Sequence, residues 1–204
     1  MITRRHIRIK VLHHLYAHAS DNELGAATLL KNLDKSLEEV HDLFIWDIHA
    51  LLRIHSTASD RLDKVRSRKV PDSALADRIS AFTDIPFFDL VRNDARLIAF
   101  SEGVHADWSA YDNHFRGLWE QVFESEEYDK LLAMRDDFGA QKRFIKYMYQ
   151  EYIAENELLH DIYEDMHVGW SDDVDAAQMM SGKVISRWWP CQTLLQRDIS
   201  TSST

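Results

Sequence analysis

Apolar residues recur at helical spacing from the start of the chain. In the opening segment Ile7, Val11 and Leu15 follow one another at intervals of four, and Leu12 and Tyr16 widen the stripe. This pattern predicts a first helix with an apolar stripe along one side.

A longer second helix is predicted after Ser20 and Glu23, whose spacing is that of a capping box. Its apolar face is formed by Leu29, Leu33, Leu37, Val40, Phe44, Ile48 and Leu51. The stretch 56–73 is polar and contains Pro71, so we expect a short helix and a linker there.

The second half of the chain continues the helical pattern. Pro86 suits the first turn of a helix that Gly103 ends, and two further helical segments are expected near 107–123 and 126–136. The longest pattern follows Gly139 and closes at Gly169; its apolar residues are Phe144, Met148, Tyr152, Leu159, Tyr163 and Met166. Asp172 and Asp173 then favour the start of a last helix.

The sequence therefore predicts an all-α, multi-helix bundle. We expect an N-terminal helical pair with a basic start at 1–56, a linker or short helix at 57–73, a helical region at 74–187 and an irregular tail at 188–204. The tail contains Pro190 and lacks a sustained period, which predicts loose packing, with Trp188 among the residues that could be exposed.

Composition supports this fold class. Only 6 Gly and 3 Pro occur among 204 residues, too few for the many tight turns of an all-β fold. The single cysteine, Cys191, excludes an internal disulfide framework and favours a reducing compartment. No apolar run approaches the length of about 18 residues that spans a bilayer. We therefore expect a cytoplasmic protein.

Candidate chemistry centres on histidine rather than on a nucleophile. Cys191 lies in the irregular tail, and there is no Gly-rich phosphate loop or nucleophile elbow, so we expect neither an enzyme nor a cofactor. Three Glu-x-x-His pairs occur, Glu38/His41, Glu102/His105 and Glu157/His160, and two such pairs help to build the di-iron site of ferritin-like bundles. Helix geometry turns Glu157 away from the apolar stripe and leaves Glu38 at a stripe edge. These directions argue against a shared metal site. A di-iron or other metal-binding helical bundle is kept as the alternative function, and no residue is assigned as a ligand.

Charge is distributed unevenly along the chain. The net charge is −10, yet Arg4, Arg5, Arg8 and Lys10 precede the first acidic residue, Asp21. Arginines in the first turn of a helix oppose the helix dipole, and an external anion would remove that conflict. RNA phosphate is a natural candidate because guanidinium groups bind it bidentately. The alternative is a solvated terminus, or salt bridges to the acidic remainder of the chain.

Two stretches resemble a known family. The opening "RRHIRIKVLHHLY" resembles the start of NusB, the bacterial transcription antitermination factor, which has an Arg-rich cluster followed by an apolar helix ending in Leu-Tyr. The segment 144–179, "FIKYMYQEYIAENELLHDIYEDMHVGWSDDVDAAQM", resembles the middle of a long NusB variant with a helical insertion.

The resemblance implies an all-α protein that acts in transcription antitermination or termination. It would bind single-stranded, boxA-type RNA together with the ribosomal protein NusE. Arg4, Arg5 and Arg8 match the family's RNA surface, and Lys10 is added by proximity. The family's C-terminal helices have no counterpart here, so the resemblance implies a bundle that is incomplete at its C-terminus, with NusE binding reduced accordingly.

Overall fold

The structure, a computed structural model, describes residues 2–20, 25–70, 72–104, 106–167 and 169–188. Over these residues the chain forms ten α-helices and no strand, which confirms the all-α prediction. The helices are α1 (Arg4–Ser20), α2 (Ala26–Arg66), α3 (Ser73–Thr83), α4 (Pro86–Arg92), α5 (Ala95–Ser101), α6 (Asp112–Glu124), α7 (Glu126–Ala133), α8 (Phe138–Tyr149), α9 (Glu157–Met166) and α10 (Trp170–Arg187). None of the helices in this part of the chain combines the length and apolar character needed to cross a membrane.

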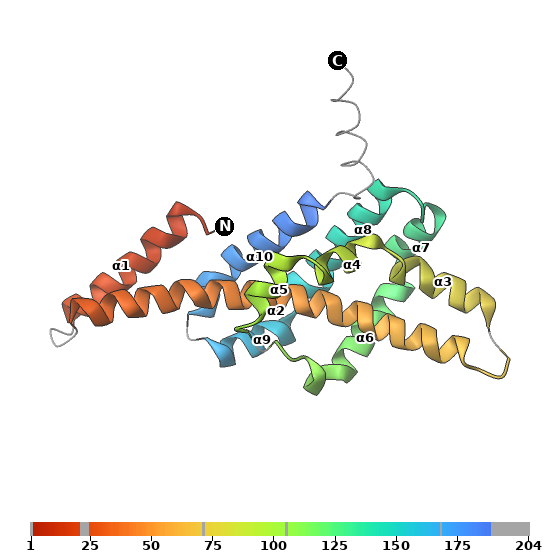
Figure 1. The fold of residues 1–204 in the computed structure, drawn as a ribbon, viewed down its shortest axis with the longest axis horizontal. Helices are drawn as coiled ribbons and strands as arrows, with labels where there is room; N and C mark the ends of the chain where they lie inside the picture. The colour runs from red at the N-terminus through yellow and green to blue at the C-terminus, as the bar shows by residue number, and fades with distance from the viewer. Residues whose placement is uncertain (1, 21–24, 71, 105, 168, 189–204) are drawn as a thin grey trace, which may run out of the picture.

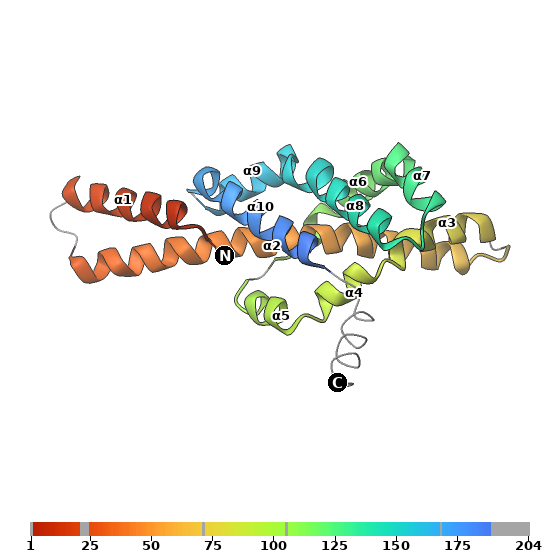
Figure 2. The same ribbon diagram turned by 90° about the horizontal axis from the view of Figure 1, so that it is seen from above.

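Helix α2 is the spine of the fold and runs along almost the whole molecule (Figure 1). Helix α1 folds back beside its N-terminal part, whereas α3 returns along its C-terminal part. Seen from above, α6 to α10 cover one side of α2, and α4 with α5 lie on the opposite side (Figure 2). The polypeptide therefore packs as two unequal layers around one long helix.

The predicted apolar face of α2 lies in the core from Val40 onward. Val40, Phe44, Ile48 and Leu51 are buried, whereas the earlier leucines of the same stripe are half-buried. Aromatic residues fill the space beside α2, with the Phe82 ring stacked on Trp119 at 4.9 Å. Burying such side chains supplies most of the stabilisation of a bundle of this kind.

The segment 57–73, predicted as a linker or short helix, is helical as far as Arg66. Helix α2 continues to Arg66, and its last turns bury Ala58, Leu62 and Val65 in the core. These three apolar residues keep helical spacing within an otherwise polar segment. The predicted end of the second helix was therefore placed too early in the chain. The segment therefore does not separate two units, and the connection to α3 is confined to 67–72.

The longest predicted helix is interrupted. A π-helical turn at Gln150–Ala154 follows α8, and α9 starts afresh with Asn156 as its N-cap. The Asn156 side chain accepts a hydrogen bond from the Leu159 backbone N–H at 3.2 Å. A strong cap inside an apolar pattern thus marks a helix boundary that the hydrophobic period alone conceals.

Trp188, the first residue of the predicted tail, is buried rather than loosely packed. Its ring packs against Phe138 at 4.5 Å and Phe87 at 5.3 Å, and this contact joins the end of α10 to α4 and α8. The rest of the predicted tail, 189–204, lies outside the described residues, so the expectation of loose packing there stays a prediction.

A buried carboxylate ties four helices together. Asp47 of α2 is 2% exposed and accepts hydrogen bonds from Tyr149 Oη at 2.6 Å, Tyr163 Oη at 2.8 Å and Ser181 Oγ at 3.2 Å. Burial raises the pKa of Asp47, and the three hydroxyl donors oppose that shift. The donors come from α8, α9 and α10, so this one side chain fixes how that layer sits on α2.

Buried histidines should make the fold sensitive to mild acid. His55 donates from Nε2 to the Thr83 carbonyl at 3.0 Å, and its Nδ1 accepts from Arg92 at 2.7 Å. Burial lowers the pKa of His55, and burial likewise lowers the pKa values of His49 and His114. Asp84 and Asp89 oppose the shift at His55, and Arg92 adds to it.

We therefore expect the free energy of unfolding to fall as the pH drops from 7 to 5. The unfolded chain binds these protons at the ordinary histidine pKa, whereas the folded chain resists them until a lower pH. Urea denaturation at several pH values measures this slope, and His55→Gln should flatten it. A profile that His55→Gln leaves unchanged would contradict the assignment.

Candidate nucleic-acid interface

The N-terminal arginines occupy the first turns of α1. Thr3 precedes the helix and caps it, because its Oγ1 accepts a hydrogen bond from the His6 backbone N–H at 3.3 Å. Arg4, Arg5 and Arg8 are exposed, and their side chains form no ion pair or hydrogen bond with any described residue. There is no acidic residue in the first turn to offset them. The three guanidinium groups are therefore available to an external anion.

The apolar stripe of α1 is largely exposed. Leu12, Leu15 and Tyr16 are 65%, 50% and 75% exposed, whereas Val11 is half-buried. At about 100° per residue these three side chains share one arc of the helix with Arg4 and Arg8. The outer face of α1 is thus basic near its start and apolar further along.

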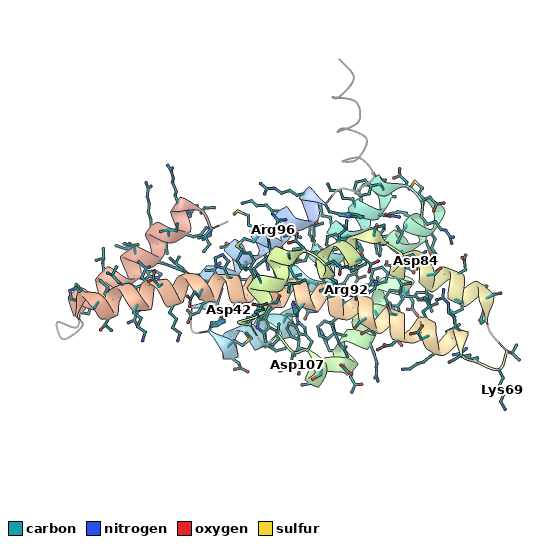
Figure 3. All side chains as sticks on the ribbon, viewed as in Figure 1. Asp42, Lys69, Asp84, Arg92, Arg96 and Asp107 are labelled. Atoms are coloured by element: carbon teal, nitrogen blue, oxygen red, sulfur yellow. The ribbon has the colours of Figure 1, made fainter. Side chains whose placement is uncertain are left out.

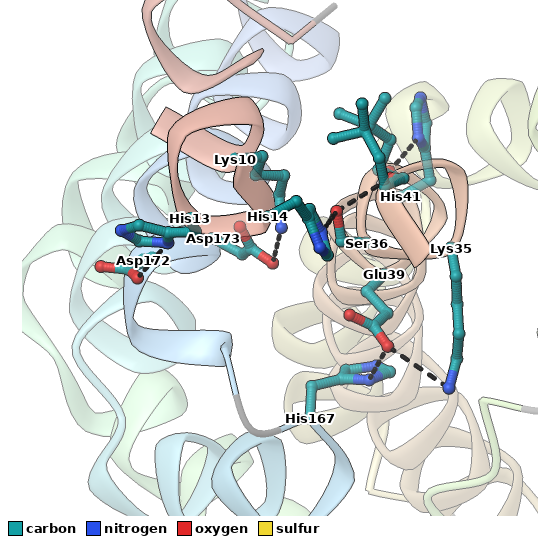
Figure 4. Close-up of polar contacts among 12 residues, drawn as sticks. Lys10, His13, His14, Lys35, Ser36, Glu39, His41, His167, Asp172 and Asp173 are labelled. Carbon is teal, nitrogen blue, oxygen red and sulfur yellow. Dashed lines mark hydrogen bonds and ion pairs between the residues drawn. The ribbon is translucent and has the colours of Figure 1, made fainter. Parts of the chain in front are cut away.

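The inner face of α1 is polar. His14 Nε2 lies 3.1 Å from Ser36 Oγ of α2, and Lys10 Nζ lies 2.8 Å from Asp173 Oδ2 of α10 (Figure 4). Nearby, His13 approaches Asp172 at 3.8 Å, a contact between two exposed side chains that contributes little. No side chain of α1 is fully buried. Polar contacts, rather than a hydrophobic core, hold this helix in place.

Lys10 differs from the three arginines with which it was predicted to bind RNA, because its side chain is paired within the protein. Its side chain is 11% exposed and that of Asp173 is 3% exposed, so the pair is largely withdrawn from water. Burial raises the pKa of Asp173, and the Lys10 ammonium counteracts that effect. Because its charge is already paired with Asp173, we expect Lys10 to position α1 rather than to extend the basic surface.

A small cavity of about 180 Å³ lies where α1, α2 and the start of α10 meet. Its lining combines basic and acidic side chains, among them Lys10, His14, Glu39 and Asp173. Glu39 is also 3.9 Å from His167 and 3.8 Å from Lys35 (Figure 4). The acidic groups stand on the inner side of α1, so an anion approaching the arginines meets the opposite side.

The second basic run of the sequence lies far from α1. Arg66, Arg68 and Lys69 are exposed at the C-terminal end of α2 and beyond it, and Figure 3 shows Lys69 at the opposite end of the molecule from α1. The structure therefore does not join the two basic runs into one surface.

The Glu-x-x-His pairs do not meet. Glu38 and Glu157 are exposed, whereas His41 and His160 contact the backbone carbonyls of Leu37 at 3.1 Å and Ala154 at 2.9 Å. His105 lies outside the described residues. Within the part of the chain that the structure describes, no group of three or more His, Cys, Asp or Glu side chains could hold one metal ion.

No known protein family matches the chain, and neither a curated protein nor a solved structure does.

Proposed function

We propose that this protein is an RNA-binding factor of transcription antitermination or termination, as its resemblance to NusB implies, and that Arg4, Arg5 and Arg8 bind single-stranded, boxA-type RNA. The observation that carries the proposal is the presence of three exposed arginines without an internal partner on the first turns of one helix. Two backbone N–H groups of the first turn, those of Arg4 and Arg5, precede the one that Thr3 caps and can add to phosphate binding.

The acidic balance of the chain supports a local site. A protein with a net charge of −10 repels nucleic acid over most of its surface, so binding must come from a patch. Each phosphate neutralised on a single strand contributes a salt slope of about −0.7, and three arginines therefore predict a total of about −2. Affinity should be weak in the absence of a protein partner.

Fluorescence anisotropy with a labelled boxA-type RNA tests this proposal. Arg4→Ala, Arg5→Ala and Arg8→Ala together should abolish measurable binding and leave helicity unchanged, because alanine favours helices and these side chains make no internal contact. The matched control is the triple variant Arg66→Ala, Arg68→Ala and Lys69→Ala, which removes the same charge at the other end of the molecule. If the control loses RNA while the N-terminal variant keeps it, the site assignment is wrong.

The resemblance also proposes NusE as a protein partner, for which exposed Leu12, Leu15 and Tyr16 offer an apolar surface beside the arginines. Adding NusE to the anisotropy assay should increase the RNA affinity of the unaltered chain. Leu15→Ala, which removes apolar surface without adding charge, should reduce that increase and leave the affinity for RNA alone unchanged.

A further inference from the structure

A groove of about 370 Å³ lies on the side of α2 that faces α4 and α5. No residue of α1 lines it, so it is separate from the candidate RNA surface. Its floor is aliphatic and consists of Ile45, Ile48, Leu52, Val91, Leu97 and Ile98. The volume falls in the range of small-molecule sites, and a mostly apolar lining with a few placed polar groups is typical of them.

Arg92 gives this groove a fixed cation. Its Nη2 donates to Nδ1 of His55, which is 4% exposed, and His55 is itself held by the Thr83 carbonyl. That chain of hydrogen bonds fixes which nitrogen of His55 accepts, and it orients the guanidinium at the edge of the groove (Figure 3 labels Arg92).

The charge of Arg92 is poorly balanced within the protein. The Asp89 carboxylate is 3.9 Å from Arg92 Nη1, and its side chain is 82% exposed, so water weakens the pair. A guanidinium has five N–H donors, and only one is used in the bond to His55. The remaining donors suit a carboxylate, which guanidinium groups bind in forked geometry.

The other polar groups of the groove limit the ligand. His49 Nε2 lies 3.2 Å from Ser101 Oγ, and the Ser101 hydroxyl also donates to the Leu97 carbonyl at 2.8 Å. Glu102 also lines the groove and, together with Asp89 nearby, disfavours a polyanion such as RNA or a nucleoside triphosphate. A ligand with one negative charge and an apolar body fits both the charge and the floor.

We propose that the groove between α2, α4 and α5 binds a small amphipathic carboxylate, with the carboxylate on Arg92 and the apolar body on the aliphatic floor. The site is independent of the proposed RNA surface, because the two share no residue.

Hexanoate is the probe, with hexan-1-ol and acetate as matched compounds that lack the charge and the apolar body. Methyl NMR of the full chain should show shifts at Val91, Leu97 and Ile98, and hexanoate should bind about tenfold more tightly than hexan-1-ol, with acetate weaker than either. Arg92→Gln should lower hexanoate affinity about tenfold, to the level of the alcohol. Arg96→Gln is the control, since that side chain is 84% exposed and paired with Asp94.

Three results would overturn the proposal. The first is equal binding of hexanoate and hexan-1-ol by the unaltered chain, which would leave no role for Arg92. The second is an equal loss of hexanoate affinity in the Arg92→Gln and Arg96→Gln variants, which would mean that any nearby positive charge attracts hexanoate and that Arg92 does not bind it directly. The third is methyl shifts in the groove that follow protein concentration rather than hexanoate, since a second copy of the chain would then occupy this face.

Discussion

Replacing Asp47 by alanine is expected to lower the free energy of unfolding by about 3–5 kcal/mol. The substitution leaves three buried hydroxyl groups, on Tyr149, Tyr163 and Ser181, without their acceptor. Each buried polar group that loses its partner costs about 1–3 kcal/mol, and the total is a large part of the 5–15 kcal/mol that stabilises a typical domain.

Asp47→Asn separates the hydrogen bonds from the charge. Asparagine keeps one carbonyl acceptor and removes the charge whose burial raises the pKa of Asp47, so the loss should be only about 1–2 kcal/mol. Asp34→Ala, at an exposed position on the same helix, should change stability by less than about 0.5 kcal/mol. Urea denaturation followed by tryptophan fluorescence measures all three variants. A loss in Asp47→Ala no larger than that of the Asp34 control would mean that the carboxylate does not hold the helices together.

The core could be predicted from the sequence wherever its pattern is long and regular. Val40, Phe44, Ile48 and Leu51 keep helical spacing inside a 41-residue helix, and all four are buried. Such a face is identified by local periodicity alone, because any tertiary packing of that helix would use it.

Asp47 could not be predicted in the same way. Its partners lie 102, 116 and 134 positions away in the sequence, and local patterning treats an aspartate as a surface residue. The only local signal is its place within "LFIWDIHALL", where an isolated carboxylate interrupts an apolar run. A buried charge of this kind requires hydrogen-bonding partners, and the pattern does not identify them.

The candidate RNA surface was predictable in part. The arginines follow from the sequence, but the orientation of α1 does not, because apolar and polar residues occur on both sides of the helix. Lys10 and Asp173 are 163 positions apart, and their contact decides which side faces inward. Proximity in the sequence therefore grouped Lys10, which is paired and largely buried, with arginines that are exposed.

The second large effect is expected in α1, where the loss of the Lys10 charge should weaken the docking of this helix. Lys10→Met should increase hydrogen exchange in residues 4–20 by about 10- to 100-fold, equivalent to about 1.4–2.8 kcal/mol of docking free energy. The substitution leaves Asp173 buried without its cation, a situation that costs about 3–5 kcal/mol if nothing moves. Undocking of α1 returns water to Asp173, and the cost is then limited to the docking free energy of a helix that buries no side chain completely. Global unfolding should accordingly change little.

The double variant Lys10→Met with Asp173→Asn tests the pair itself. With both charges removed no unpaired ion remains, so the exchange protection of α1 should largely return. If the single and double variants exchange equally fast, the packing of the Lys10 stem rather than its charge holds the helix.

The single variant Lys10→Met also distinguishes a positioning role of Lys10 from direct contact with RNA. A lysine that binds phosphate contributes about −0.7 to the salt slope of RNA binding, and its removal should make the slope shallower by that amount. Because Lys10 is paired with Asp173 at 2.8 Å and largely buried, we expect Lys10→Met to leave the slope near −2 while changing the affinity itself. Arg8 lies two residues before Lys10 and is exposed, so Arg8→Ala should instead make the salt slope shallower. If Lys10→Met keeps the salt slope of the unaltered chain and Arg8→Ala makes it shallower, the phosphate contacts lie on the arginines. If Lys10→Met also makes the slope shallower, Lys10 belongs to the RNA surface.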